Sequence, residues 1–195
     1  MQAEGVIVSG QIAAWHAEHL NFARLLRLLE AQVGLFAHGE EPDYTLMEDI
    51  VYYLQHFPDV HHHRYENEIF RRMGERDPLL RPLITKLLQE HRVIAAAGAG
   101  LLEQLDAVAG GAVVARSRLE AAAATYLGYY RAHLDAEESV ALPRAGELLD
   151  ARDWADVARV VAENSRDDPL FGPQTEQRFR ALRLNIEHEA AATTA

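Results

Sequence analysis

Apolar side chains recur every three to four residues along four long stretches of this chain, and this spacing constrains the fold most. The stretches cover residues 9–37, 43–73, 80–108 and 113–138. A period near 3.6 residues places such side chains on one face of a helix, and no run alternates as a β-strand would. The pattern therefore predicts an all-α chain whose long helices bury one face against each other.

The connections between these stretches are short and carry residues that end helices. Gly39, Asp77-Pro78 and Gly110-Gly111 mark the three turns, and Ser9 is the expected N-cap of the first helix. Pro58 lacks a backbone donor, so a kink or short break is expected within the second stretch. Four long helices with short loops favour an up-down-up-down four-helix bundle.

Shorter amphipathic segments follow, at 151–164 and 174–189, and predict additional C-terminal helices. The segment DDPLFGP between them is typical of a loop. We therefore expect residues 1–150 to form the bundle and residues 151–195 to form a helical extension packed on it.

Charge and composition exclude several partners. The chain has 19 Lys and Arg against 30 Asp and Glu, a formal charge of −11, which disfavours nucleic acid and anionic membranes. No apolar stretch approaches the roughly 18 residues that span a membrane, and the first residues lack the pattern of a signal peptide. With no cysteine present, we expect a soluble protein of the reducing cytoplasm.

The absence of cysteine also leaves histidine and carboxylate as the strong ligands for a transition metal, and the chain has 10 histidines. His62 and Glu66 stand four residues apart on the second predicted helix, as do His133 and Glu137 on the fourth. Positions i and i+4 share one helix face, so each pair can aim an imidazole nitrogen and a carboxylate at one point.

The first and third helices each add a histidine, His19 and His91, on the apolar stripe. Four imidazoles and two carboxylates can hold two metal ions, with the carboxylates as bridges. The alternative is that each histidine is bonded to a backbone carbonyl in the core and that each His–Glu pair lies at the surface.

Four segments of the chain resemble the hemerythrin-like family, the HHE cation-binding domain. They are His19, HHHRYENE at 61–68, Glu90-His91 and HLDAEE at 133–138. The similarity covers residues 10–145, and DPLFG at 168–172 resembles the trailing segment of longer bacterial members.

This resemblance implies a four-helix bundle that holds a non-haem centre of two iron ions. Carried over position by position, the implied ligands are His19, His62, Glu66, His91, His133 and Glu137. Glu66 and Glu137 would be the bridges.

One departure from the family pattern concerns the third helix. Oxygen-carrying hemerythrins use a fifth histidine, four residues from the first on that helix, whereas Leu87 and Ala95 stand four residues from His91 here. The sixth position on one metal ion would then be filled by water, a tyrosine or another histidine, or it would stay open. This departure argues against simple reversible oxygen carriage.

Several further residues are candidates near the centre. His63 is a possible alternative ligand, and Glu138 is an alternative bridge. Tyr126, Tyr129 and Tyr130 are candidate ligands or hydrogen-bond donors. Glu18 and Glu90 are candidates to orient an imidazole from outside.

The expected function is that of a di-iron protein that binds or senses dioxygen, peroxide or nitric oxide. The first alternative is a di-iron peroxidase or oxidase, which would turn its ligand over. The second is an iron-handling or interaction module without oxygen chemistry, either metal-free or holding zinc. The sequence indicates neither a protein partner nor an oligomeric state.

Overall fold

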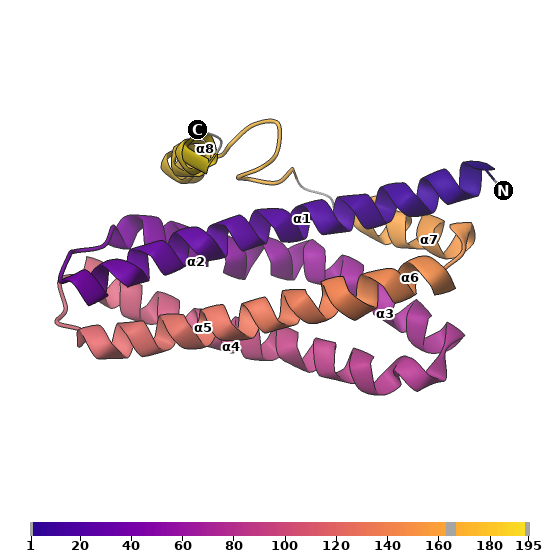
Figure 1. Cartoon of the computed structure of the whole chain (residues 1–195), viewed down its shortest axis with the longest axis horizontal. Helices are drawn as coiled ribbons and strands as arrows, with labels where there is room; N and C mark the ends of the chain where they lie inside the picture. The colour runs from indigo at the N-terminus through magenta and orange to yellow at the C-terminus, as the bar shows by residue number, and fades with distance from the viewer. Residues whose placement is uncertain (1, 163–166, 194–195) are drawn as a thin grey trace. The chain divides into compact units, whose positions relative to one another are not determined.

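The computed structural model of the chain describes residues 2–162 and 167–193, and these contain helices and no strand (Figure 1). The helices are α1 (Gln2–Leu35), α2 (Tyr44–Val60), α3 (His62–Arg76), α4 (Arg81–Ala109), α5 (Arg116–Ala136), α6 (Leu142–Leu148), α7 (Ala151–Ala162) and α8 (Arg180–Thr193). The predicted all-α bundle with additional C-terminal helices is confirmed. No described helix is long and apolar enough to cross a membrane.

Most helix ends lie where the sequence predicts them. Gly39 and Gly111 take the left-handed conformation, with φ of 74° and 81°, which glycine adopts without strain. Asp43 accepts a hydrogen bond from the Leu46 backbone at 2.9 Å and caps α2. The prediction for Ser9 is wrong: α1 already begins at Gln2, because residues 2–8 contain no proline that would stop the helix.

The predicted break after Pro58 is confirmed. Pro58 lies inside α2, which ends at Val60, and His61 separates it from α3. Because proline cannot donate to the carbonyl four residues earlier, the helix is weakened at this point. The break makes His62 the first residue of α3.

A π-helical segment, Glu137–Ala141, joins α5 to α6. The sequence pattern after residue 138 also allows the fourth helix to extend past Pro143 to Leu149, and α6 covers this extension, but the π-helical turn was not predicted. Such turns widen a helix by one residue and occur often at functional sites. Here the wider turn begins at Glu137, one of the predicted ligands.

The chain forms two compact units, to which α1, α4 and α5 each contribute residues. Unit 1 is formed from residues 1–21, 59–94 and 129–166, and unit 2 from residues 22–58, 95–128 and 167–195. The expected domain boundary at residue 150 stays a prediction.

In unit 1, α7 packs against α3 through apolar and charged side chains. Trp154 and Val157 of α7 join an apolar cluster that includes Phe70 of α3. Arg72 of α3 contacts Asp153 of α7 at 3.0 Å, and both side chains are largely buried. The predicted helix at 151–164 is therefore present as α7, although residues 163 and 164 lie outside the described part.

In unit 2, the DPLFG segment forms a turn held by Asp168. One carboxylate oxygen of Asp168 accepts backbone hydrogen bonds from Leu170 and Phe171 at 2.8 Å, and the other accepts one from the Tyr53 hydroxyl at 2.8 Å. The loop predicted between the two C-terminal helices is thus tied to α2.

Candidate metal centre

The structure places all six predicted ligands in one buried cluster of unit 1. They come from α1 (His19), α3 (His62 and Glu66), α4 (His91), α5 (His133) and the π-helical segment (Glu137). Each residue is at most 8% exposed, and both glutamates are fully buried. Buried carboxylates are rare unless they are paired or bind a cation, so this position requires a compensating charge.

The two pairs spaced four residues apart are in contact, as predicted. His62 Nε2 lies 2.8 Å from Glu66 Oε1, and His133 Nε2 lies 3.1 Å from Glu137 Oε1. Both pairs point into the interior of the unit, so they are not surface ion pairs.

The two glutamates also connect the pairs to the remaining histidines. Glu66 Oε2 lies 3.2 Å from His91 Nε2, and Glu66 Oε1 lies 3.4 Å from His19 Nε2. Glu137 Oε2 lies 3.4 Å from His19 Nε2. Each carboxylate therefore contacts histidines from more than one helix, as a bridging ligand would.

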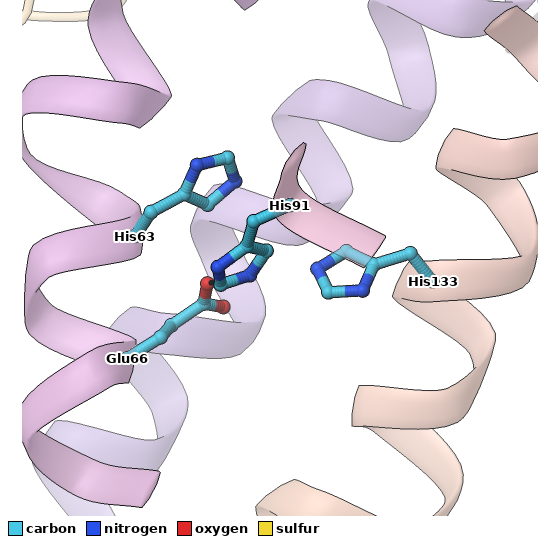
Figure 2. A group of neighbouring side chains, drawn as sticks. All are labelled: His63, Glu66, His91 and His133. Atoms are coloured by element: carbon cyan, nitrogen blue, oxygen red, sulfur yellow. Dashed lines mark ion pairs between the residues drawn. The ribbon is translucent and has the colours of Figure 1, made fainter. Parts of the chain in front are cut away.

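Together with His63, these side chains form two groups, and the ligand atoms in each lie within 4.8 Å of one another. The first group comprises His19, His62, Glu66 and Glu137. The second group comprises His63, Glu66, His91 and His133 (Figure 2). Each group can hold a metal ion, and Glu66 belongs to both.

The sequence reasoning missed His63 as a main member of the cluster. His63 is 6% exposed, and its ring stacks on that of His91 with centroids 4.0 Å apart. Neighbouring residues on a helix point about 100° apart. Because the two groups lie side by side, His62 and His63 each face a different one, and the run of three histidines at 61–63 was the available signal.

Three carboxylates bind the outer nitrogens of the clustered histidines. His62 Nδ1 lies 2.5 Å from Glu18, His19 Nδ1 lies 2.7 Å from Glu138, and His133 Nδ1 lies 3.2 Å from Glu90. A carboxylate at Nδ1 favours the proton there and leaves the Nε2 lone pair directed inward.

Glu18 and Glu90 thus contact imidazoles from outside the cluster, where the sequence predicts them. Glu138 makes the same kind of contact. Glu138 is 33% exposed and also contacts the half-exposed His16 at 2.8 Å. It belongs to neither four-residue group. The structure therefore places Glu137, and not Glu138, among the inward carboxylates.

Several inward atoms lack hydrogen bonds that would explain their burial. Within the described part of the chain, His91 Nε2, His133 Nε2, Glu66 Oε2 and both oxygens of Glu137 make no hydrogen bond of good geometry, although they lie close to one another. Buried polar atoms are nearly always satisfied. A cation at their common focus would satisfy all of them, so the donor set fits a metal ion.

The site's electrostatics favour positive charge. Burial lowers the pKa of His62, but Glu66 and Glu18 outweigh this effect and raise it to about 10. Burial likewise lowers the pKa of His91, which Glu137 and Glu66 raise to about 9. Burial raises the pKa of Glu66, but the charge of His62 and hydrogen bonds from neighbouring imidazoles hold it well below 4.5.

The three tyrosine candidates differ in burial and in the unit to which they belong. Tyr129 is 50% exposed, whereas Tyr130 is 1% exposed. Tyr126 belongs to unit 2, and Tyr129 and Tyr130 belong to unit 1. His63 is a histidine candidate for the position that the sequence left open for a tyrosine or a histidine, because it belongs to the second group.

A buried cluster of imidazoles and carboxylates between helices is the arrangement with which cation-binding helical bundles hold their metal ions. The family model of the hemerythrin HHE cation-binding domain matches residues 11–145, and the chain belongs to this family. Neither the curated proteins nor the solved structures contain a match to the chain.

Proposed function

We propose that this chain is a non-haem di-iron protein that binds or senses dioxygen, peroxide or nitric oxide. The observation that carries the proposal is the division of seven buried side chains into two groups that share Glu66. Two groups support two ions, and a shared carboxylate supports a bridge between them. Imidazole and carboxylate ligands suit iron.

The residues have distinct roles in this proposal. His63, His91 and His133 would hold one ion, and His19 and His62 would hold the other. Glu66 and Glu137 each contact histidines of both groups and would be the bridges. Iron bound here would supply redox-active positions at which a small molecule can coordinate. Glu138, Glu18 and Glu90 keep the imidazoles of His19, His62 and His133 in the tautomer that ligation requires.

His63 bears on the choice of ligand. The sequence lacks a second histidine on α4, which argued against simple oxygen carriage. His63 offers a fifth buried imidazole from α3 in its place. The number of imidazoles is therefore no longer an argument against reversible dioxygen binding. Dioxygen remains one of the proposed ligands, with peroxide and nitric oxide.

A cavity of about 250 Å³ lies next to the cluster. It is formed by α1, α3 and α7, and it is lined by Gln11, Ala14, Trp15, Glu18, His61, His62, Tyr65 and Ala158. His62 lies both in this lining and in the metal cluster, so this cavity is the route that we propose for a small ligand. We also propose a cytoplasmic location, which the absence of cysteine supports.

Iron content is the first test. Protein expressed with ample iron should contain about two iron atoms per chain by elemental analysis and should absorb visible light. Glu66→Ala and Glu137→Ala should each hold fewer than two, because each removes a carboxylate with contacts to several histidines. A wild-type chain without iron, or with a single zinc, would reject the proposal.

Peroxide consumption distinguishes binding from catalysis. If the iron-loaded protein removes peroxide over many turnovers, the di-iron enzyme alternative is correct. A stoichiometric spectral change on addition of dioxygen, peroxide or nitric oxide, without turnover, supports binding or sensing.

A further inference from the structure

Trp15 makes a direct hydrogen bond to the carboxylate that both groups share. Its indole Nε1 donates to Glu66 Oε1 at 2.8 Å, and the side chain is 1% exposed. An indole N–H is a donor only, with no second protonation state, whereas each imidazole can gain or lose a proton. Trp15 is therefore a constant partner of Glu66.

The contacts of Glu66 show what this bond controls. Oε1, the atom bonded to Trp15, lies 2.8 Å from His62 Nε2 in the first group. Oε2 lies 3.2 Å from His91 Nε2 in the second group. The plane of the carboxylate thus determines whether each oxygen faces its own group.

The indole is itself held in place by aromatic neighbours. Its ring lies edge-on to His19 and to Tyr65, with centroids 5.9 Å away in each case, and 6.2 Å from Phe70. A buried aromatic ring packed on several sides has little freedom to turn. Its N–H direction is consequently fixed before any ligand binds.

We propose that Trp15 is a positioning residue whose indole N–H holds the carboxylate plane of Glu66, so that each oxygen faces one of the two metal-holding groups. This inference rests on the proposed function, because it assigns Glu66 as the bridge. A hydrogen bond to a buried carboxylate is charge-assisted and therefore strong for a neutral donor. Its loss leaves the carboxylate held only by imidazoles, whose contacts change with their protonation.

The chain offers a matched control in its only other tryptophan, Trp154. Trp154 is fully buried in the same apolar cluster of unit 1 as Trp15. Its Nε1 has no hydrogen-bond partner among the residues described. Trp15→Phe and Trp154→Phe therefore make the same change in ring size, but only the first removes a hydrogen bond to Glu66.

The test measures metal affinity and ligand geometry. Trp15→Phe should weaken Fe(II) binding roughly 10- to 100-fold in competition with a chelator, the range typical when a partner of a metal ligand is removed. It should also alter the visible absorption of the Co(II)-loaded protein. Trp154→Phe should match the wild type in both measurements, even if it unfolds at a lower temperature.

A measurement on the wild type covers the case in which Trp15→Phe does not fold. Nitrogen-15 NMR of the chain should show two indole N–H signals, one for each tryptophan, and Trp154→Phe would assign them. The Trp15 signal should be shifted downfield and protected from solvent exchange, and Zn(II) should move it while leaving the Trp154 signal in place. A Trp15 signal that exchanges freely, or that ignores Zn(II) bound by the chain, overturns the inference.

The outcomes separate this inference from the proposed function. If the wild type binds no iron, the proposed function fails. If it binds two iron atoms and Trp15→Phe keeps the wild-type affinity and Co(II) spectrum, only the role of Trp15 is wrong. Equal losses in both tryptophan variants would assign the effect to packing and would also reject the role.

Discussion

Three carboxylates distinguish these buried histidines from ordinary core histidines. Glu18, Glu90 and Glu138 each contact the outer Nδ1 of a different histidine, so the inner Nε2 atoms share one orientation. A core histidine usually bonds to a backbone carbonyl or water, and it does not need a carboxylate at each of its two ring nitrogens. At the scale of single residues, the arrangement is that of prepared ligands.

Removing one outer carboxylate should weaken the centre without removing a ligand. Glu138→Ala deletes the partner of His19 Nδ1, so we expect iron affinity to fall about 10- to 100-fold in chelator competition. Glu75→Ala is the control, because it removes a carboxylate of α3 that is 62% exposed and pairs with Arg71, and it should leave the affinity unchanged. Equal affinities in both variants would show that Glu138 does not orient His19.

At the scale of elements, helix ends decide which side chains reach the interior. The break at His61 starts α3 at His62, and the π-helical segment starts at Glu137. Proline explains the first feature, and the sequence predicts it. No residue of the segment EESVA distinguishes a π-helical turn from an α-helical one, so the second feature emerges only in the fold.

The start of α7 provides a test of pH dependence. Asp150 accepts backbone hydrogen bonds from Arg152 at 2.9 Å and Asp153 at 3.1 Å, and its other oxygen contacts Arg76 at 2.6 Å. The backbone bond from Asp153 and the Arg76 side chain lower the pKa of Asp150 below its ordinary 3.8. The ionised form is thus the one that stabilises the helix.

A lowered pKa in the folded state gives stability that is complete above pH 3.8 and is lost as the pH falls through the folded-state value. Asp150→Ala should therefore unfold at a lower temperature than the wild type at pH 7. The difference should narrow below pH 3.8, where the carboxyl group of Asp150 becomes protonated. A difference that stays constant with pH would contradict this role of Asp150.

At the scale of the whole molecule, the buried cluster lowers the free energy of unfolding of the metal-free protein. Polar atoms of Glu66, His91, His133 and Glu137 without hydrogen bonds are destabilising in the interior. A metal ion that binds only the folded chain removes this cost and adds its own binding free energy to stability.

Metal removal should therefore lower the unfolding temperature. Calorimetry of the iron-loaded wild type should show a higher transition than the same protein after treatment with a chelator, and the gap should grow with free Fe(II). The double variant Glu66→Ala/Glu137→Ala should show no dependence on Fe(II). Identical transitions with and without iron in the wild type would mean that the cluster does not couple metal binding to folding.

Much of this protein follows from local sequence patterns. Apolar periodicity, glycine and proline determine the helices, since these depend on side-chain spacing and backbone freedom within one segment. The spacing of four residues is likewise local, and it brings His62 to Glu66 and His133 to Glu137.

Contacts between segments far apart in the chain were decided only by the tertiary structure. It selected His63 as a fifth imidazole, turned Glu138 outward to His19, exposed Tyr129, and placed Trp15 against Glu66. These outcomes depend on how helices rotate about their axes and on where a π-helical turn falls. The sequence determines which face each helix buries, whereas packing between helices determines which atoms meet there.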